Sequence, residues 1–132
     1  MTAMSDDIIT AGSKLKQIRQ RAMNAVMEYE NAKGRNPRDM SQKRKIGFDI
    51  ESSSRKIEVK GQEWKWSKLK SSFLYMTENE LRNATHIYIV CDVFGSPDIH
   101  VFDLSKVPFK AIKTEVRYLL LMAHVRDFEI KE

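Results

Sequence analysis

The chain has 132 residues, of which 42% are hydrophobic and 31% are charged, values typical of one soluble domain that is long enough to bury a core. Its 23 Lys and Arg residues outnumber 18 Asp and Glu residues, and the formal net charge of +5 favours an anionic partner such as nucleic acid. The single Cys91 excludes an internal disulfide and a cysteine zinc cluster, and no apolar run is long enough to span a membrane, so we expect a cytoplasmic protein without a membrane partner.

The first part of the chain predicts a long helix. Residues 1–12 show no clear pattern and are expected to form a loose N-terminal tail, followed by a single domain over residues 13–132. Gly34 is suited to end the helix as its C′ residue. Glu30 lies at the edge of the apolar stripe, where it either reaches a site at the sheet or stays on the helix surface. The stripe consists of residues at spacings of three and four, namely Leu15, Ile18, Ala22, Ala25, Val26 and Tyr29.

Residues 35–45 form a polar connection that contains a basic run, Lys43, Arg44 and Lys45. A solvated loop is the simplest interpretation of the connection as a whole. The run stands directly before the next strand, where it is well placed to meet phosphates. Binding through such a run would weaken with rising salt concentration.

The segment from Ile46 to Gly61 predicts a β-hairpin, because apolar residues alternate along both of its halves. If Ser53 and Ser54 form a two-residue turn, the register follows from the sequence. The residues expected to face each other are Glu51 and Lys56, Ile50 and Ile57, Asp49 and Glu58, and Phe48 and Val59.

The predicted pairing places two carboxylates, Asp49 and Glu58, directly opposite each other, where they repel. A divalent cation held by their oxygen atoms would offset the repulsion, with the Lys60 ammonium close by. Gly47 and Gly61 flank the hairpin and leave room for a ligand. A solvated face of mixed charge is the alternative. The pattern predicts a Mg²⁺ site, with Mn²⁺ as a possible substitute.

Basic and aromatic residues are interleaved after the hairpin. Trp64 and Trp66 alternate with Lys65, and Lys68 follows. This pattern suits nucleic-acid contact, and Lys65 and Lys68 would extend the phosphate-facing surface of the earlier basic run. Packing of at least one Trp into the core is an alternative, as is a homodimer with residues 64–66 at its interface.

The second half of the chain predicts strands and one short helix. Thr77 and Glu80 have the spacing of a capping box, so we expect Glu80 to cap a helix that ends near Ala84. Pro108 could open a helix, and a helix is favoured over residues 112–125, with a strand as the alternative for EVRYLLLMA. Strands are expected over Phe73–Met76, His86–Phe94 and Ile99–Leu104.

Four strings stand in sequence: YENAKGR, GFDIES, RKIEVKG and YMTENEL. With the order helix, three strands, helix, strand, they make residues 22–104 resemble the PD-(D/E)XK, or restriction-endonuclease-like, nuclease superfamily. More narrowly, the strings resemble the NO VEIN C-terminal domain family. The resemblance implies an α/β fold with a mixed β-sheet flanked by helices in αβββαβ order. It also implies a Mg²⁺-dependent nuclease acting on DNA, in a defence or restriction system, or an inactive nucleic-acid-binding or interaction module on the same fold.

The resemblance also implies roles for single residues. Asp49 and Glu58 would be Mg²⁺ ligands, and the carbonyl of Val59 would complete the protein's share of the coordination. Lys60 would activate the attacking water or stabilise charge on the phosphate. Glu30 would match the additional helix-borne acid of many superfamily members. The chain departs from the superfamily pattern in having no Pro before Asp49.

Overall fold

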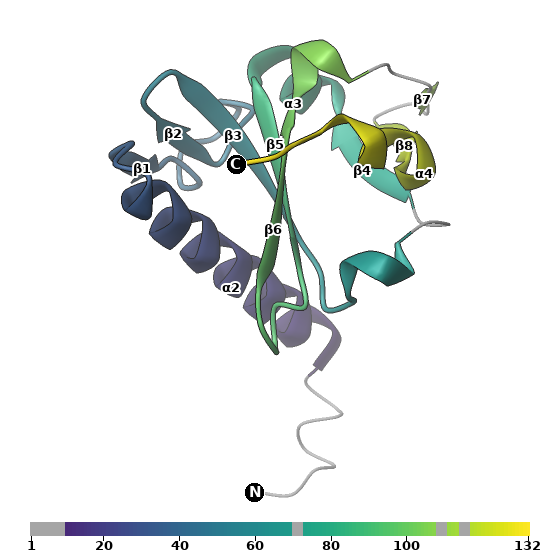
Figure 1. Cartoon of the computed structure of the whole chain (residues 1–132), viewed down its shortest axis with the longest axis horizontal. Coiled ribbons are helices and arrows are strands. Elements are labelled where there is room, and N and C mark those ends of the chain that lie inside the picture. Colours follow the sequence, from purple (N-terminus) through teal and green to yellow (C-terminus); the bar gives the residue numbers. More distant parts are fainter. Residues whose placement is uncertain (1–9, 70–72, 108–110, 114–116) are drawn as a thin grey trace, which may run out of the picture.

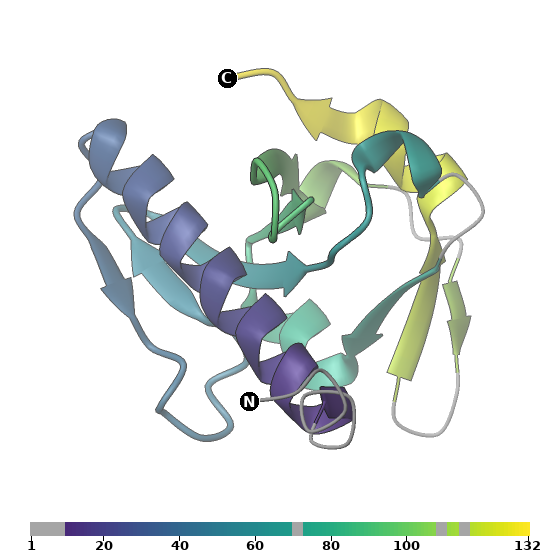
Figure 2. The same cartoon turned by 90° about the horizontal axis from the view of Figure 1, so that it is seen from below.

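The computed structural model describes residues 10–69, 73–107, 111–113 and 117–132 (Figure 1). A mixed six-stranded sheet forms the centre of an α/β fold, with one long helix on one face and a small second sheet on the other (Figures 1 and 2). In spatial order the large sheet contains β1 (Pro37–Asp39), β2 (Ile50–Ser52), β3 (Arg55–Gly61), β5 (His86–Cys91), β6 (Asp98–Asp103) and β9 (Glu129–Ile130). The small sheet contains β4 (Phe73–Thr77), β8 (Arg117–Leu121) and β7 (Ala111–Lys113). The helices are α2 (Thr10–Ala32), α3 (Glu78–Asn83) and α4 (Met122–Val125), with 3-10 turns η1 (Trp66–Lys68), η2 (Leu104–Lys106) and η3 (Arg126–Phe128).

The long helix α2 forms as predicted and begins at Thr10, three residues before the expected start of the domain. It ends in a Schellman motif, because the N–H of Gly34 donates to Asn31 O and the N–H of Arg35 donates to Glu30 O. Gly34 has a φ of +74°, which glycine adopts without strain. Within the described residues, no helix combines the length and the apolar character needed to cross a bilayer.

The predicted hairpin forms between β2 and β3, with its turn at Ser53 and Ser54. The ladder pairs Ile50 with Ile57 and Glu51 with Lys56, which confirms the predicted register for these residues. Both Ile side chains are fully buried.

The first strand leaves the ladder at Asp49, so the prediction that Asp49 faces Glu58 and Phe48 faces Val59 is wrong. The N–H of Asp49 still donates to the carbonyl of Ile57 at 2.8 Å, although Ile57 already pairs with the next residue of β2. Asp49 and Ile50 thus both lie opposite Ile57, and Asp49 is the extra residue of a β-bulge. Phe48 therefore packs in the core between the two sheets, whereas Val59 packs with α2.

Gly47 explains why the chain turns away from β3. Its φ is +85°, and a Cβ at this position would lie 2.7 Å from the carbonyl oxygen of Asn79 and 2.8 Å from Cβ of Asn83, both in α3. Asn79 also donates a hydrogen bond to the carbonyl of Lys45. The glycine permits close contact with α3, so it does not leave room for a ligand as expected.

The αβββαβ order holds in the large sheet, but its strands differ from those expected. Pro37–Asp39, predicted as a polar connection, forms the edge strand β1, where Pro37 takes the first position because it has no N–H to donate. The predicted strand β4 exists, but it pairs with β8 in the small sheet. The helix favoured over residues 112–125 is wrong for Arg117–Leu121, since long-range pairing with β4 overrides the helix preference of Leu. Pro108 lies outside the described residues.

The two faces of β3 and β5 serve different layers. Val59 and Tyr88 pack with α2, whereas Ile87 and Ile89 pack with residues of β4. Cys91 is buried as expected for a structural thiol, and burial raises the pKa of its thiol to about 12.

Trp66 packs into the core, which confirms the prediction for one of the two Trp residues. Its ring stacks on His100 with centroids 3.8 Å apart, and the Arg126 guanidinium lies 4.2 Å from the ring centroid. The two ring nitrogens of His100 lie 2.7 Å from Glu129 and 2.8 Å from Asp98. These contacts fix η1 against β6 and β9.

Gly61 provides a test of how closely α2 packs on β3. A Cβ at Gly61 would lie 2.6 Å from Cβ of Ala22 and 3.1 Å from Ile18 O, so Gly61→Ala must push the helix away. We expect a loss of about 1–3 kcal/mol in the free energy of unfolding, measured by urea denaturation. Gly12→Ala is the control, because open space surrounds Gly12 in the same helix. Equal stability of the Gly61→Ala variant and the wild type would contradict the close packing.

Candidate functional site

A cavity of about 550 Å³ opens among the first half of α2, β3, β4 and α3. Four titratable side chains that interact with one another lie in its wall: Asp49, Glu58, Lys60 and Glu80. The remaining wall consists of Leu15, Ile18, Arg19, Ala22, Met23, Ser41, Val59, Gly61, Gln62, Leu74 and Tyr75. The structure thus brings together the three hairpin residues singled out in the sequence, and adds Glu80.

Asp49 is held by the backbone of β3. Its Oδ2 accepts a hydrogen bond of 2.9 Å from the N–H of Val59, a group that continued pairing with the first strand would otherwise satisfy. Burial raises the pKa of Asp49, while this backbone hydrogen bond and one from the side chain of Glu58 oppose the rise. The bulge therefore delivers the Asp49 carboxyl to Glu58 without placing the two residues opposite each other.

Glu58 is the most deeply buried acid of the cavity, with only 5% of its surface exposed. Burial raises the pKa of its carboxyl to about 9, and the nearby charges of Asp49 and Glu80 add to the rise against the opposing effect of Lys60. Without a bound cation, Glu58 thus keeps its proton at neutral pH. That proton lets Glu58 donate a hydrogen bond to Asp49.

Lys60 lies between two acids. Its Nζ is 3.1 Å from Oε2 of Glu58 and 3.1 Å from Oε1 of Glu80. Burial lowers the pKa of the ammonium, but the attraction of the two acids outweighs it and leaves the pKa raised. Lys60 thus links Glu58 of its own strand to Glu80 of α3.

Glu80 reaches the cavity because a capping box fixes the first turn of α3. The N–H of Glu80 donates to Oγ1 of Thr77, and the Glu80 carboxylate accepts from the N–H of Thr77, each at 3.1 Å. The capping role predicted from the sequence is therefore confirmed. The same Oε1 also contacts Lys60, which the sequence did not reveal because the capping spacing alone explained Glu80.

Glu30 lies outside the cavity, on the opposite face of the large sheet. It is fully buried, and its Oε2 accepts hydrogen bonds from Tyr88 OH at 2.8 Å and Arg35 Nη1 at 2.7 Å. Tyr88 belongs to the α2 side of the sheet with Val59, whereas Glu58 alternates to the other side. The sheet thus separates Glu30 from Glu58, and its placement gives no support to the role of a helix-borne acid in the same site.

Around Glu30, a network of charges holds the end of the described chain. The side chain of Glu132 lies 2.8 Å from Arg35 Nη2 and 2.8 Å from Arg55 Nη2, and Tyr29 OH donates to it at 2.6 Å. These partners hold the pKa of Glu132 at about 2 although burial opposes them. The network explains Glu30 as a structural acid that anchors Arg35.

The five cations expected to meet phosphates are exposed but fall into two groups. Lys43, Arg44 and Lys45 lie in the connection from β1 to β2, next to α3. Lys65 and Lys68 lie at η1, well apart from the first group in both views (Figures 1 and 2). The cavity elements α3 and the first half of α2 lie between the groups in Figure 2.

The donor set of the cavity is compatible with Mg²⁺. Asp49 and Glu58 offer hard oxygen atoms within hydrogen-bond reach of each other, and Val59, whose N–H donates to Asp49, follows Glu58 in the cavity wall. Within the residues that the structure describes, no group of three or more His, Cys, Asp or Glu side chains is placed to hold a metal ion. The protein would thus supply two carboxylates, which is enough for an ion that keeps several of its waters.

Comparison with known families assigns the chain. The model of the family described as Protein NO VEIN, C-terminal, matches residues 18–102. The chain belongs to this family. The match includes Asp49, Glu58, Lys60 and Glu80. It ends within β6, so β7 and β8 of the small sheet lie outside it. No curated protein and no solved structure matches the chain.

The burial of Glu58 predicts how stability depends on pH. Between about 4.5 and about 9 the folded protein holds a proton on Glu58 that the unfolded chain releases, so raising the pH favours unfolding. In EDTA, we expect this residue to lower the free energy of unfolding by up to about 1.4 kcal/mol per pH unit across that range. Glu58→Gln should remove this slope, as measured by urea denaturation from pH 5 to 9.

The matched control is Glu28→Gln, which changes an exposed acid on α2. Its pH profile should run parallel to that of the wild type. A Glu58→Gln profile that also runs parallel to the wild type would show that Glu58 is ionised in the folded protein.

Proposed function

We propose that this domain is a Mg²⁺-dependent nuclease that hydrolyses phosphodiester bonds of DNA. The observation that carries the proposal is the meeting of Asp49, Glu58 and Lys60 in one cavity wall, beside a fourth charged group, Glu80. A buried acid with a strongly raised pKa and specific charged neighbours in a cavity is typical of a functional site, and Glu58 is 5% exposed beside Asp49 and Lys60. Membership of the NO VEIN C-terminal family fits the proposal without testing it.

In this proposal, Asp49 and Glu58 hold the cation, and the carbonyl of Val59 completes the protein's share. When bound, Mg²⁺ neutralises charge on the scissile phosphate and lowers the pKa of water. Lys60 Nζ orients the attacking water or stabilises the negative charge that develops on the phosphate. Glu80 is a positioning residue, because it contacts Lys60 and is itself fixed by Thr77.

The two groups of exposed cations support DNA as the substrate. Lys43, Arg44 and Lys45 lie in the connection from β1 to β2, next to α3, and Lys65 and Lys68 lie at η1, which follows the cavity residue Gln62. Exposed cations from two segments that adjoin the cavity are therefore available to a nucleic-acid backbone. Contacts of this kind go to phosphates and carry no direct sequence information. They therefore fit binding without base specificity.

A catalytically inactive nucleic-acid-binding module is the second candidate. The observation that favours it is the position of Lys60, whose ammonium lies 3.1 Å from each of two acids and is already satisfied. A lysine held in this way can stabilise the fold without acting on a substrate. Cleavage assays separate the two candidates.

Lys60→Ala should separate catalysis from binding. Single-turnover cleavage of one DNA substrate with Mg²⁺ should slow by about 10²–10⁴-fold, because a charge stabiliser or proton-transfer group is lost. Metal affinity, measured by titration calorimetry, should stay near the wild-type value or rise, since a positive neighbour of the two acids is removed. Asp49→Ala should instead lose the metal site and cleavage together.

Lys56→Ala is the control, because Lys56 lies four residues before Lys60 on the same strand but outside the cavity. It should cleave at nearly the wild-type rate. If wild type and Lys60→Ala cleave equally fast, the assignment of Lys60 is wrong. If the wild type cleaves neither plasmid nor single-stranded DNA with Mg²⁺ or Mn²⁺, the inactive module is the correct function.

Glu80→Gln tests the positioning of Lys60 without removing the helix cap, since Gln also completes a capping box. We expect cleavage to slow by about 10–100-fold, the effect of losing a hydrogen bond to a charged group. The basic limb of the pH–rate profile should move to lower pH, because an acid that raises the pKa of Lys60 has been neutralised. Glu78→Gln, on the same helix and paired with Arg82, should change neither quantity. An unchanged profile for Glu80→Gln would leave Glu80 with a capping role alone.

A further inference from the structure

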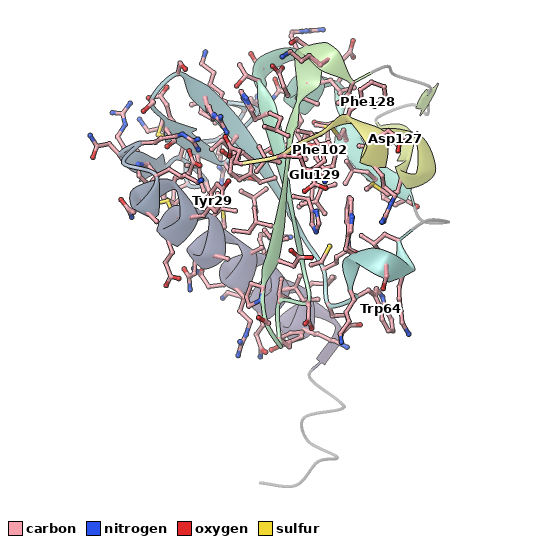
Figure 3. The ribbon with its side chains drawn as sticks, viewed as in Figure 1. Tyr29, Trp64, Phe102, Asp127, Phe128 and Glu129 are labelled. Atoms are coloured by element: carbon pink, nitrogen blue, oxygen red, sulfur yellow. The ribbon has the colours of Figure 1, made fainter. Side chains whose placement is uncertain are left out.

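Trp64 is exposed in a way that its neighbour Trp66 is not. It has 57% of its surface exposed, the highest fraction among the aromatic residues that the structure describes. Trp66, two residues later, stacks on His100 in the interior. Figure 3 shows Trp64 at the edge of the molecule beside η1. Trp66 is thus held by packing against His100, whereas the indole of Trp64 is exposed.

Backbone hydrogen bonds fix the segment that carries Trp64. The carbonyl of Trp64 accepts a 2.9 Å hydrogen bond from the N–H of Asp92. Two residues earlier, Gln62 donates to the carbonyl of Val90 at 2.9 Å and accepts from the N–H of Val93 at 3.2 Å. The segment thus continues the pairing of β3 with β5 past the end of the strands. A ring on such a support loses little freedom when it is covered by a ligand.

Positive charge and a second exposed ring accompany Trp64. Phe94 follows Asp92 by two residues, is 40% exposed, and has the guanidinium of Arg21 5.1 Å from its ring centroid. Lys65 and Lys68 are exposed on the same segment as Trp64. The carboxylate of Asp92 accepts a hydrogen bond from the N–H of Ser96 in the turn after β5. The surface around the indole therefore combines exposed aromatic faces with cations.

We propose that Trp64 is a stacking platform for an unpaired base of single-stranded nucleic acid. An exposed indole next to cations provides both contacts that such strands use, since bases stack on aromatic rings and phosphates meet Lys and Arg. A duplex cannot use the ring in this way, because its base faces are already stacked. The surface thus selects a single strand over a duplex.

The platform lies next to the candidate site along the chain. Gln62 lines the cavity and precedes Trp64 by two residues, so at most about 7 Å of backbone separates them. A base on Trp64 would place the following phosphates near Lys60. This link to cleavage rests on the proposed nuclease function, but the binding itself does not.

The test is a binding measurement in EDTA, where no metal-dependent cleavage occurs. Fluorescence anisotropy follows a fluorescein-labelled single-stranded 20-mer of mixed sequence, and the same strand in a duplex, at low salt. Trp64→Ala should weaken single-strand binding by about 5–150-fold, the effect of losing one stacked base, and change duplex binding less than about twofold. Trp64→Phe should recover most of the affinity. In Trp66→Phe, the fluorescence of the remaining Trp64 should be quenched by the single strand.

Phe128→Ala is the matched control, because Phe128 is 38% exposed on η3, far from Trp64 in Figure 3. It should leave both affinities unchanged. Equal weakening of single-strand and duplex binding by Trp64→Ala, or no weakening, overturns the proposal, as does a wild type that binds no single strand. Sedimentation that shows a dimer lost in Trp64→Ala, with single-strand affinity unchanged, would assign the ring to a dimer interface instead. Because binding is measured in EDTA and cleavage with Mg²⁺, failure of the nuclease proposal remains distinguishable from failure of this one.

Discussion

The burial of one carboxyl group, that of Glu58, is the constraint on which the rest of the site depends. A buried carboxyl must find hydrogen-bond partners or keep its proton, and Glu58 does both by meeting Asp49 and Lys60. Its strand, β3, pairs with β2 as far as Ile57 and with β5 from Ile57 to Gly61, which limits how far the backbone at Glu58 can move to relieve the burial. The groups that contact Glu58 and Lys60 come from outside β3: Asp49 from the bulge before β2, and Glu80 from the short helix α3.

Alternation along β3 separates a structural network from the chemical one. Residues that point toward α2 are apolar or join the cluster of Glu30, Arg35 and Tyr88, which anchors the end of α2. Glu58 and Lys60 point the other way, into the cavity beside α3. The sheet therefore keeps two groups of buried charge apart. The Glu30 group anchors the end of α2, although Oε1 of Glu30 has no hydrogen-bond partner among the described residues, and the other group lines the cavity.

Local patterns in the sequence predicted the local features well. The Ser53–Ser54 turn, the capping box at Thr77 and the helix end at Gly34 each depend on a few adjacent residues, and all three were predicted correctly. The errors have long-range causes. Alternation could not reveal that Gly47 packs against α3 and removes Asp49 from the ladder, nor that β4 pairs with β8. The contact of Glu80 with Lys60 was missed because the capping role already explained Glu80, and two placements of Glu30 stayed open because no pattern tells on which face of the sheet a helix lies.

Glu80 both caps α3 and contacts Lys60, so the assembly of the site depends on this short helix. Helix α3 has only six residues, none of them fully buried, and its one hydrophobic side chain, Leu81, packs against the core. Elements of this kind open locally at temperatures well below global unfolding. When α3 opens, the cap at Thr77 is lost, and Lys60 loses its contact with Glu80 while the large sheet remains intact. Heat should thus disable the cavity first and the fold later, so a calorimetric melting temperature would overstate the range in which the site is assembled.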